Sequence, residues 1–191
     1  MRDTQVYEKI LETAELLIQQ RGFNAFSFRD ISNVVGVKTS SIHYYFPTKS
    51  ALAAAVVHRH AENTLAQLNA LEANRKLSFE QMLLRYIDFI FNNTYKTETK
   101  MCLGGMLATE VLTLNDEVRG AVKHFLALNE SWLARIIQMG IESGEFNKSN
   151  SSQELARAVF ALVEGCLVLV RLFDDERYLK AIKLQALRLV K

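Results

Sequence analysis

The sequence predicts an all-α protein of about nine helices, with a small three-helix head at the N-terminal end followed by a larger helical bundle. Apolar residues recur at steps of three and four along most of the chain, which is the spacing of amphipathic helices. Strict alternation and Asn-Gly hairpin turns, which indicate strands, are missing. Pro47 is the single proline among 191 residues, and this favours uninterrupted helices because proline breaks helix interiors.

The head is delimited by glycine, proline and capping residues. Gly22 ends the first helix, and Ser27 and Asp30 have the spacing of a capping box that opens the second. Pro47 and Thr48 end the third helix and cap the fourth. The predicted helices of the head are Val6–Gln20, residues 28–35 and Thr39–Tyr45, and a helix from Lys49 to about Leu71 follows them.

Similar signals divide the rest of the chain into longer elements. Ser78 with Gln81 and Ser151 with Glu154 form capping boxes, and Gly144 ends the longest helix. The predicted helices are residues 78 to about 93, Leu103–Leu114, Asp116–Ser143, residues 151–173 and Glu176–Val190. They form the larger bundle of the predicted fold.

The spacing around Gly36 predicts a helix-turn-helix between Phe28 and Tyr45. We expect an inward face made of Ile31, Val34, Val35, Ile42 and Phe46. The second helix then exposes hydroxyl and aromatic side chains suited to phosphates and base edges, namely Thr39, Ser40, Ser41, His43, Tyr44 and Tyr45. The net charge of +2 alone does not indicate nucleic acid, but residues 31–61 contain no acid, which favours DNA binding by this segment.

Bulk features exclude several other classes of protein. Cys102 and Cys166 are too few and too far apart for a disulfide framework or a zinc site, and the N-terminal residues lack the apolar core of a signal peptide. The apolar stretch 158–173 is interrupted by Glu164 and Arg171, so a buried helix explains it better than a membrane span. We therefore expect a cytoplasmic protein with no metal, no cofactor and no membrane partner.

The four histidines do not support an enzyme. None lies beside a Ser, Cys or carboxylate pair at a recognisable catalytic spacing. His58 and His60 are two residues apart on a helix and point away from each other, which is poor spacing for metal ligands. The sequence thus predicts a binding protein without catalytic activity.

Residues 10–56 resemble the DNA-binding domain of the TetR family of bacterial regulators. The matching positions are Ile10, Ala14, Leu17, Gly22, Phe23, residues 28–31, Gly36, Val37 and the run 42–52. The remainder is more loosely similar to the family's ligand-binding and dimerising domain, best over 101–110 and 132–144. The resemblance implies a DNA-binding domain at 1–48 and a ligand-binding and dimerisation domain at 49–191. It also implies a repressor that binds a palindromic operator as a homodimer and is released by a small-molecule effector.

The same resemblance implies which residues contact DNA. It assigns the exposed set of the second helix to DNA, with Lys49 and Arg29 holding flanking phosphates. Lys38 stands where the family usually has Ser or Thr, so a helix cap is lost or passes to Thr39 while a positive charge is gained. His43 stands where the family usually has Tyr, so an imidazole replaces a hydroxyl that binds phosphate.

The last two helices carry small and apolar faces that we expect to form the dimer interface, through Ala158, Leu162, Gly165, Leu169, Leu179, Ile182 and Ala186. Aromatic and methionine side chains of the middle helices are candidates for the effector site, although such residues more often simply pack. With Glu110, the candidate ligand-binding residues are Tyr86, Phe89, Met106, Glu110, Phe125, Trp132, Ile136, Met139 and Phe160. Glu110 is expected to pair with an arginine or to bind a polar or cationic ligand group.

Two alternatives to this function remain open from the sequence. Cys102 lies near a helix start and Lys100, where a thiol pKa can fall, and some family members with a similar segment respond to electrophiles or oxidants. A redox sensor acting through Cys102 is therefore an alternative, against a plain buried thiol. A helical ligand-binding protein without DNA binding is the other alternative.

Overall fold

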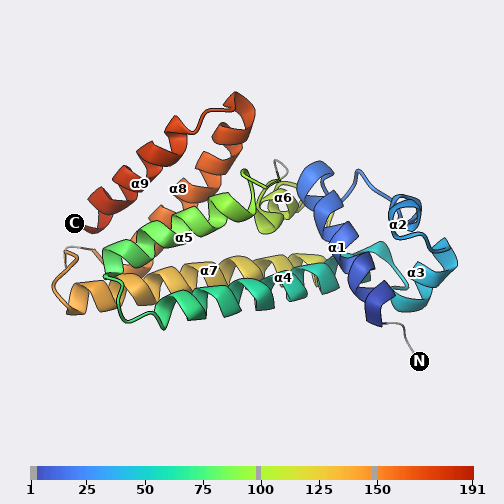
Figure 1. Ribbon diagram of the computed structural model, residues 1–191, viewed down its shortest axis with the longest axis horizontal. Coiled ribbons are helices and arrows are strands. Elements are labelled where there is room, and N and C mark those ends of the chain that lie inside the picture. The colour runs from blue at the N-terminus through green and yellow to red at the C-terminus, as the bar shows by residue number, and fades with distance from the viewer. Residues whose placement is uncertain (1–3, 98–99, 148–149) are drawn as a thin grey trace. The chain divides into compact units, whose positions relative to one another are not determined.

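The computed structural model describes residues 4–97, 100–147 and 150–191, and within these ranges the chain forms nine α-helices and no strand (Figure 1). The helices are α1 (Thr4–Arg21), α2 (Phe28–Val35), α3 (Thr39–Tyr45), α4 (Lys49–Glu72), α5 (Phe79–Asn93), α6 (Leu103–Thr109), α7 (Asp116–Glu142), α8 (Ser152–Phe173) and α9 (Arg177–Val190). The predicted all-α class is confirmed.

Helix α6 is the one element whose predicted end is clearly wrong. It ends at Thr109 rather than Leu114. The amide of Glu110 bonds to the carbonyl of Leu107 and that of Val111 to Ala108, so the last turn tightens to bonds three residues back. The following Leu112 is 94% exposed, so it adds almost no buried apolar surface that would favour a longer helix.

The chain divides into two compact units. The first contains the described residues up to Glu62 and Leu103–Phe125, and the second contains Asn63–Cys102 and Leu126–Lys191 among the described residues. Helices α4 and α7 each contribute to both units. The predicted boundary between a DNA-binding domain at 1–48 and a ligand-binding domain at 49–191 differs from this division and stays a prediction.

In the first unit, α1 packs against α2 and α6, and α2 packs against α3. The apolar stripe of α1 is buried, with Ile10, Ala14 and Ile18 fully enclosed. In the second unit α8 and α9 lie side by side, and α9 also contacts α5 (Figure 1). No helix in the described part of the chain is long and apolar enough to cross a membrane.

Candidate functional site

Helices α2 and α3 form the predicted helix-turn-helix around a glycine turn. Gly36 has φ +78°, a left-handed conformation that glycine adopts without the steric cost of a Cβ, and its amide bonds to the carbonyl of Ser32 at 3.0 Å. The Ser32 hydroxyl donates to the carbonyl of Val37 at 2.7 Å, which closes the turn from its other side. The angle between the two helices is therefore set by backbone and short side-chain bonds.

The inward face is narrower than the sequence suggested. Ile31 and Ile42 are fully buried and Phe46 is buried, as expected. Val34, in contrast, is 69% exposed, so the expectation that it faces inward is wrong. Helix α2 has eight residues, and Ile31 is the one that it buries. Val34 therefore belongs to the outer surface of the head.

The outer face of α3 carries exposed polar and aromatic side chains. Lys38, Thr39, Ser40, His43 and Tyr44 are exposed, as is Arg29 on α2, whereas Ser41 and Tyr45 are half-buried. Lys38 occupies the N-cap position and makes no capping hydrogen bond through its side chain, so the cap is lost rather than replaced. The amide of Ser41 donates to the carbonyl of Lys38 at 2.9 Å, and the Lys38 side chain adds a positive charge beside this first turn of α3.

Aromatic contacts hold the C-terminal end of α3. The His43 ring packs edge-on against Phe28, with centroids 4.7 Å apart. Tyr45 packs edge-on against Tyr7 at 5.8 Å, and Phe46 stacks on Tyr7 at 5.1 Å. These contacts orient the imidazole and the Tyr45 ring before any partner binds, which lowers the entropy cost of recognition.

Lys49, predicted to hold a phosphate, has a second role inside the head. Its ammonium donates a hydrogen bond to the carbonyl of Phe26 and lies 4.3 Å and 4.7 Å from the ring centroids of Phe26 and Phe23. Burial lowers the pKa of Lys49, while the charges of Glu110 and Asp30 act in the opposite direction. An ammonium has three donors, so a phosphate contact stays a prediction alongside this internal bond.

Glu110, immediately after α6, binds the backbone of the head. Its carboxylate accepts hydrogen bonds from the amides of Phe23, at 2.5 Å, and Asn24, at 3.2 Å. The Asn24 side chain donates to the same carboxylate at 3.1 Å and to the Thr113 hydroxyl at 2.8 Å. This contact differs from both expected roles of Glu110, which were an arginine pair and a ligand contact.

Gly22 makes this approach sterically feasible. It has φ +90°, and a Cβ at this position would lie 3.0 Å from a carboxylate oxygen of Glu110. Because the backbone turns away after α1 at this glycine, the amides of Phe23 and Asn24 point to the carboxylate instead of continuing the helix. We call the contact between Glu110 and these two amides the Glu110 clamp.

The candidate effector residues belong to both units. Met106, Glu110 and Phe125 belong to the first unit, where the Phe125 ring contacts His60 with centroids 5.0 Å apart. The others belong to the second unit, where Tyr86, Trp132 and Ile136 are fully buried and Phe89 and Phe160 are half-buried. The structure brings Tyr86 and Trp132 together as a stacked pair at 5.5 Å.

A polar cluster surrounds that stacked pair. The Tyr86 hydroxyl lies 3.4 Å from the Asn129 side-chain oxygen, and burial, with the nearby Glu164 and Cys102, raises the pKa of Tyr86 well above its usual range. Burial also raises the pKa of Glu164, against a hydrogen bond with Cys102 that lowers it. Cys102 is itself 5% exposed, so the redox candidate is a buried thiol beside a carboxyl.

Sequence analysis missed Glu164 and Asn129 as parts of this cluster. Glu164 was noted because it interrupts an apolar stretch, and a charged residue within such a stretch is the signal that indicates a buried functional group. Asn129 gives no comparable signal, because the flanking positions on α7 are of mixed polarity.

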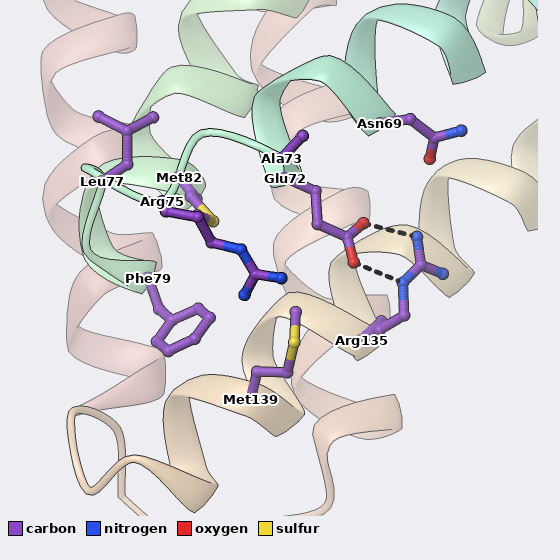
Figure 2. A pocket seen from close by; sticks show the side chains of 9 residues that line it. All are labelled: Asn69, Glu72, Ala73, Arg75, Leu77, Phe79, Met82, Arg135 and Met139. Atoms are coloured by element: carbon purple, nitrogen blue, oxygen red, sulfur yellow. Dashed lines mark hydrogen bonds and ion pairs between the residues drawn. The ribbon is translucent and has the colours of Figure 1, made fainter.

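A separate hollow of about 610 Å³ lies on the second unit where α4 ends (Figure 2). Figure 2 shows the Arg75 side chain extending toward Met139 and the ion pair of Glu72 with Arg135, whose two bonds measure 2.9 Å and 3.2 Å. The lining is Asn69, Glu72, Ala73, Arg75, Leu77, Phe79, Met82, Arg135 and Met139. The lining contains two arginines and one glutamate, so its net positive charge suits an anionic group. Of the predicted effector residues, Met139 is the one that lines this hollow.

The predicted dimer residues fall into two groups. Leu179, Ile182 and Ala186 on α9 are already buried within the protomer. Leu162 and Leu169 on α8 are 37% and 40% exposed, Gly165 is exposed and Ala158 is half-buried. Other exposed apolar residues on these two helices are Val168, Leu172, Phe173, Leu184 and Leu189.

Comparisons with known proteins agree over both parts of the chain. Residues 10–56 match a family model described as bacterial regulatory proteins, tetR family, and residues 81–185 match one described as tetracyclin repressor-like, C-terminal domain. A TetR transcriptional regulator from Legionella pneumophila is 38% identical, with a TM-score of 0.89 over 97% of each chain. A TetR-family regulator from Agrobacterium tumefaciens is 28% identical, with a TM-score of 0.92 over 98% of each chain. The repressor NemR of Escherichia coli strain K12 is 24% identical over 83% of this chain and 80% of its own.

Proposed function

The chain belongs to the TetR family of bacterial regulatory proteins and is a DNA-binding, ligand-responsive transcription regulator, and we propose that it represses transcription as a homodimer on a palindromic operator. The observation that carries the proposal is the exposed face of α3, with Thr39, Ser40, His43 and Tyr44 beside the uncapped N-terminal turn at Lys38. One short recognition helix covers few base pairs, so two heads on two half-sites are needed for useful specificity. The proposed place of action is the cytoplasm, in keeping with two free cysteines in the described chain.

The proposed dimer contact is the exposed apolar face of α8 and α9. Leu162, Gly165 and Leu169 contribute the centre of this face, and Leu172 and Phe173, which are 72% and 58% exposed, extend it. An exposed apolar surface of this extent is typical of an interaction site. Ala186 is fully buried in the protomer and is not included.

The proposed release mechanism runs through the Glu110 clamp and Lys49. The segment between α1 and α2 is bound on one side by Glu110 after α6 and on another by Lys49 at the start of α4. An effector that shifts α6 or α4 would therefore displace the backbone on which the reading head is mounted. When the separation of the two reading heads no longer matches the spacing of the half-sites, the dimer binds DNA more weakly and the operator is released.

The decisive experiment selects bound sites from random double-stranded DNA with the full chain. We expect enrichment of an inverted repeat whose half-sites are about one helical turn apart, or a multiple of that spacing. Ser40→Ala and Tyr44→Ala should weaken binding to the selected site, whereas Lys123→Ala, an exposed residue on α7, should not. Enrichment of a single unrepeated site would contradict the dimeric operator.

A second candidate function is electrophile sensing through Cys102. It is supported by the hydrogen bond between Cys102 and Glu164, because an ionised Glu164 carboxylate can take the thiol proton as general base while the sulfur forms its bond to the electrophile. The test compares loss of operator binding after treatment with a quinone in the wild type and in Cys102→Ser, with Cys166→Ser as the matched control. If Cys102→Ser is released as fully as the wild type, this candidate is wrong.

A further inference from the structure

The polar cluster in the core of the second unit contains two polar atoms that the described residues do not satisfy. Glu164 Oε1 and Trp132 Nε1 are both shielded from solvent and have no hydrogen-bond partner within the described chain. Trp132 is fully buried, and the Glu164 carboxyl is deeply buried although part of that residue reaches the surface. Unsatisfied buried polar groups are costly, so this pair of atoms points to a bound molecule with its own polar groups.

The charge at this place determines the chemistry of that molecule. A hydrogen bond from the Cys102 thiol acts on the Glu164 carboxyl, while burial raises the pKa of that carboxyl and so favours its neutral form. A buried carboxylate without a cation is strongly destabilised, and a positively charged partner stabilises it more than a neutral donor does. The acceptor at Glu164 Oε1 therefore favours a cation.

The aromatic residues beside it have the same preference. Tyr86 and Trp132 stack with ring centroids 5.5 Å apart and an interplanar angle of 21°. Tyr86 also lies within electrostatic reach of Glu164 and of Cys102, so it connects the aromatic pair to the carboxyl. The faces of Trp and Tyr attract organic cations when water is excluded. The indole N–H of Trp132, in turn, requires an acceptor atom.

We propose that Tyr86, Cys102, Trp132 and Glu164 form a subsite for a small organic cation, a protonated or quaternary amine that also carries an oxygen atom. The cationic group lies against the Glu164 carboxylate and the aromatic pair, and the oxygen accepts a hydrogen bond from the Trp132 indole. The inference rests on the proposed function, since this cation is the effector that releases the operator. The four side chains come from α5, α7, α8 and the segment before α6.

The test uses the single tryptophan of the chain, which is Trp132 and therefore reports from within the subsite. Full-length protein is titrated with tetramethylammonium, choline and benzyltrimethylammonium, each paired with the neutral compound in which carbon replaces nitrogen. For choline this compound is 3,3-dimethylbutan-1-ol. We expect at least one cation to change the fluorescence and to bind about tenfold or more tightly than its neutral counterpart. Failure of all three cations to bind would overturn the proposal.

Variants separate the subsite from other binding. Glu164→Gln should abolish the preference for the cation over its neutral counterpart, whereas Glu164→Asp should retain it. Glu142→Gln, an exposed acid on α7, serves as the control and should behave as the wild type. Equal cation affinity in the wild type and in Glu164→Gln, with both folded by circular dichroism, would also overturn the proposal.

Operator binding in the same samples distinguishes this inference from the proposed function. Cation-selective binding that leaves operator affinity unchanged supports the subsite and contradicts the role of the cation as effector. Intact operator binding without cation-selective binding contradicts the subsite and leaves the repressor proposal standing. Loss of operator affinity at cation concentrations that saturate the Trp132 signal is the expected result for both.

Discussion

The carboxylate of Glu110 accepts the backbone amide of Phe23 at 2.5 Å, across 87 residues of sequence. The segment after α6 is thereby attached to the loop that connects α1 with the helix-turn-helix. The bond joins a charged acceptor to a main-chain donor, so it is stronger than a contact between two neutral groups. Because the donor is a backbone amide, this bond fixes the main chain of the head and does not depend on the identity of the side chain at position 23.

Glu110→Ala should loosen this attachment. Hydrogen bonds to charged groups contribute about 1.5–3 kcal/mol each, and partial exposure of the carboxylate reduces this to about 1–2 kcal/mol for the clamp. We expect faster hydrogen exchange at the amides of Phe23 and Asn24 and a lower free energy of unfolding. The control is Glu117→Ala, an exposed acid in the first turn of α7. Unchanged exchange at both amides would show that the clamp does not form in solution.

Gly22→Ala should destabilise the protein because it places a Cβ 3.0 Å from Glu110 in a backbone with φ +90°. The left-handed conformation alone costs a non-glycine residue about 1–2 kcal/mol. Gly120→Ala is the matched comparison, since a Cβ on Gly120 meets nothing within 4 Å and the residue lies inside α7. Thermal unfolding should therefore show a lower midpoint for Gly22→Ala and a higher one for Gly120→Ala, whose free energy of unfolding should rise by about 0.5–1 kcal/mol. Equal midpoints would contradict the geometry at Gly22.

Lys38→Ala should weaken operator binding through loss of a phosphate contact. If Lys38 neutralises one phosphate per head, removing it lowers the slope of log affinity against log salt by about 1 per head. Fluorescence anisotropy with the selected operator over a range of salt concentrations measures this slope. Lys180→Ala, an exposed lysine on α9, should leave the slope unchanged. A Lys38→Ala slope equal to that of the wild type would remove Lys38 from the DNA interface.

Glu15 should make the stability of the first unit dependent on pH. Burial raises the pKa of Glu15, but hydrogen bonds and charge attraction from His60 and Arg59 outweigh it and leave the pKa below its ordinary 4.5. A carboxyl with a lowered pKa stabilises the folded state above pH 4.5 and loses this contribution as the pH falls through the folded pKa.

Glu15→Gln should accordingly be less stable than the wild type near neutral pH, by about 1–3 kcal/mol, and the difference should shrink below pH 4.5. Thermal denaturation of both proteins between about pH 3 and pH 7, a range that brackets the pKa of a carboxyl, measures this difference in stability. Glu12→Gln is the control, because Glu12 is 67% exposed and lies 3.9 Å from Arg59. A difference that does not depend on pH would rule out the ionised carboxylate as its source.

Leu169→Lys should dissociate the proposed dimer, because it places a charge in the middle of the exposed apolar face of α8. Sedimentation velocity should show a shift from dimer to monomer, with loss of affinity for a two-half-site operator. Leu112→Lys is the matched variant, since Leu112 is 94% exposed but lies outside α8 and α9. If Leu169→Lys remains as dimeric as Leu112→Lys, the interface lies elsewhere.

Local signals in the sequence were sufficient for most helix bounds and for the exposed outer face of α3. Gly36, the capping boxes at Ser78 and Ser151 and the apolar stripes act within one or two turns, so they could be interpreted without tertiary information. The failures have local and non-local causes. Val34 was expected to face inward but is 69% exposed, because the one residue that the eight-residue α2 buries is Ile31. The partners of Glu110 are Phe23 and Asn24, which are almost ninety residues away in the sequence.

The effector and dimer residues illustrate a second limit. Periodicity shows that a side chain faces inward, but it does not show whether the neighbour is the same protomer, a partner or a ligand. Ala186 and Leu169 belong to similar apolar stripes, yet one is fully buried in the protomer and the other is 40% exposed. The tertiary packing separates them, since α9 contacts both α8 and α5.

Helix α3 buries one of its own residues, Ile42, while Thr39 and Ser40 are exposed and the His43 ring packs against Phe28. Positions 39 and 40 can therefore be exchanged for those of another regulator without loss of the apolar core, whereas a change at position 43 also alters the contact with Phe28. If the proposed function holds, such exchanges would place a new promoter under the control of the same effector. The Glu110 clamp and the effector domain would be inherited unchanged by such a chimeric switch.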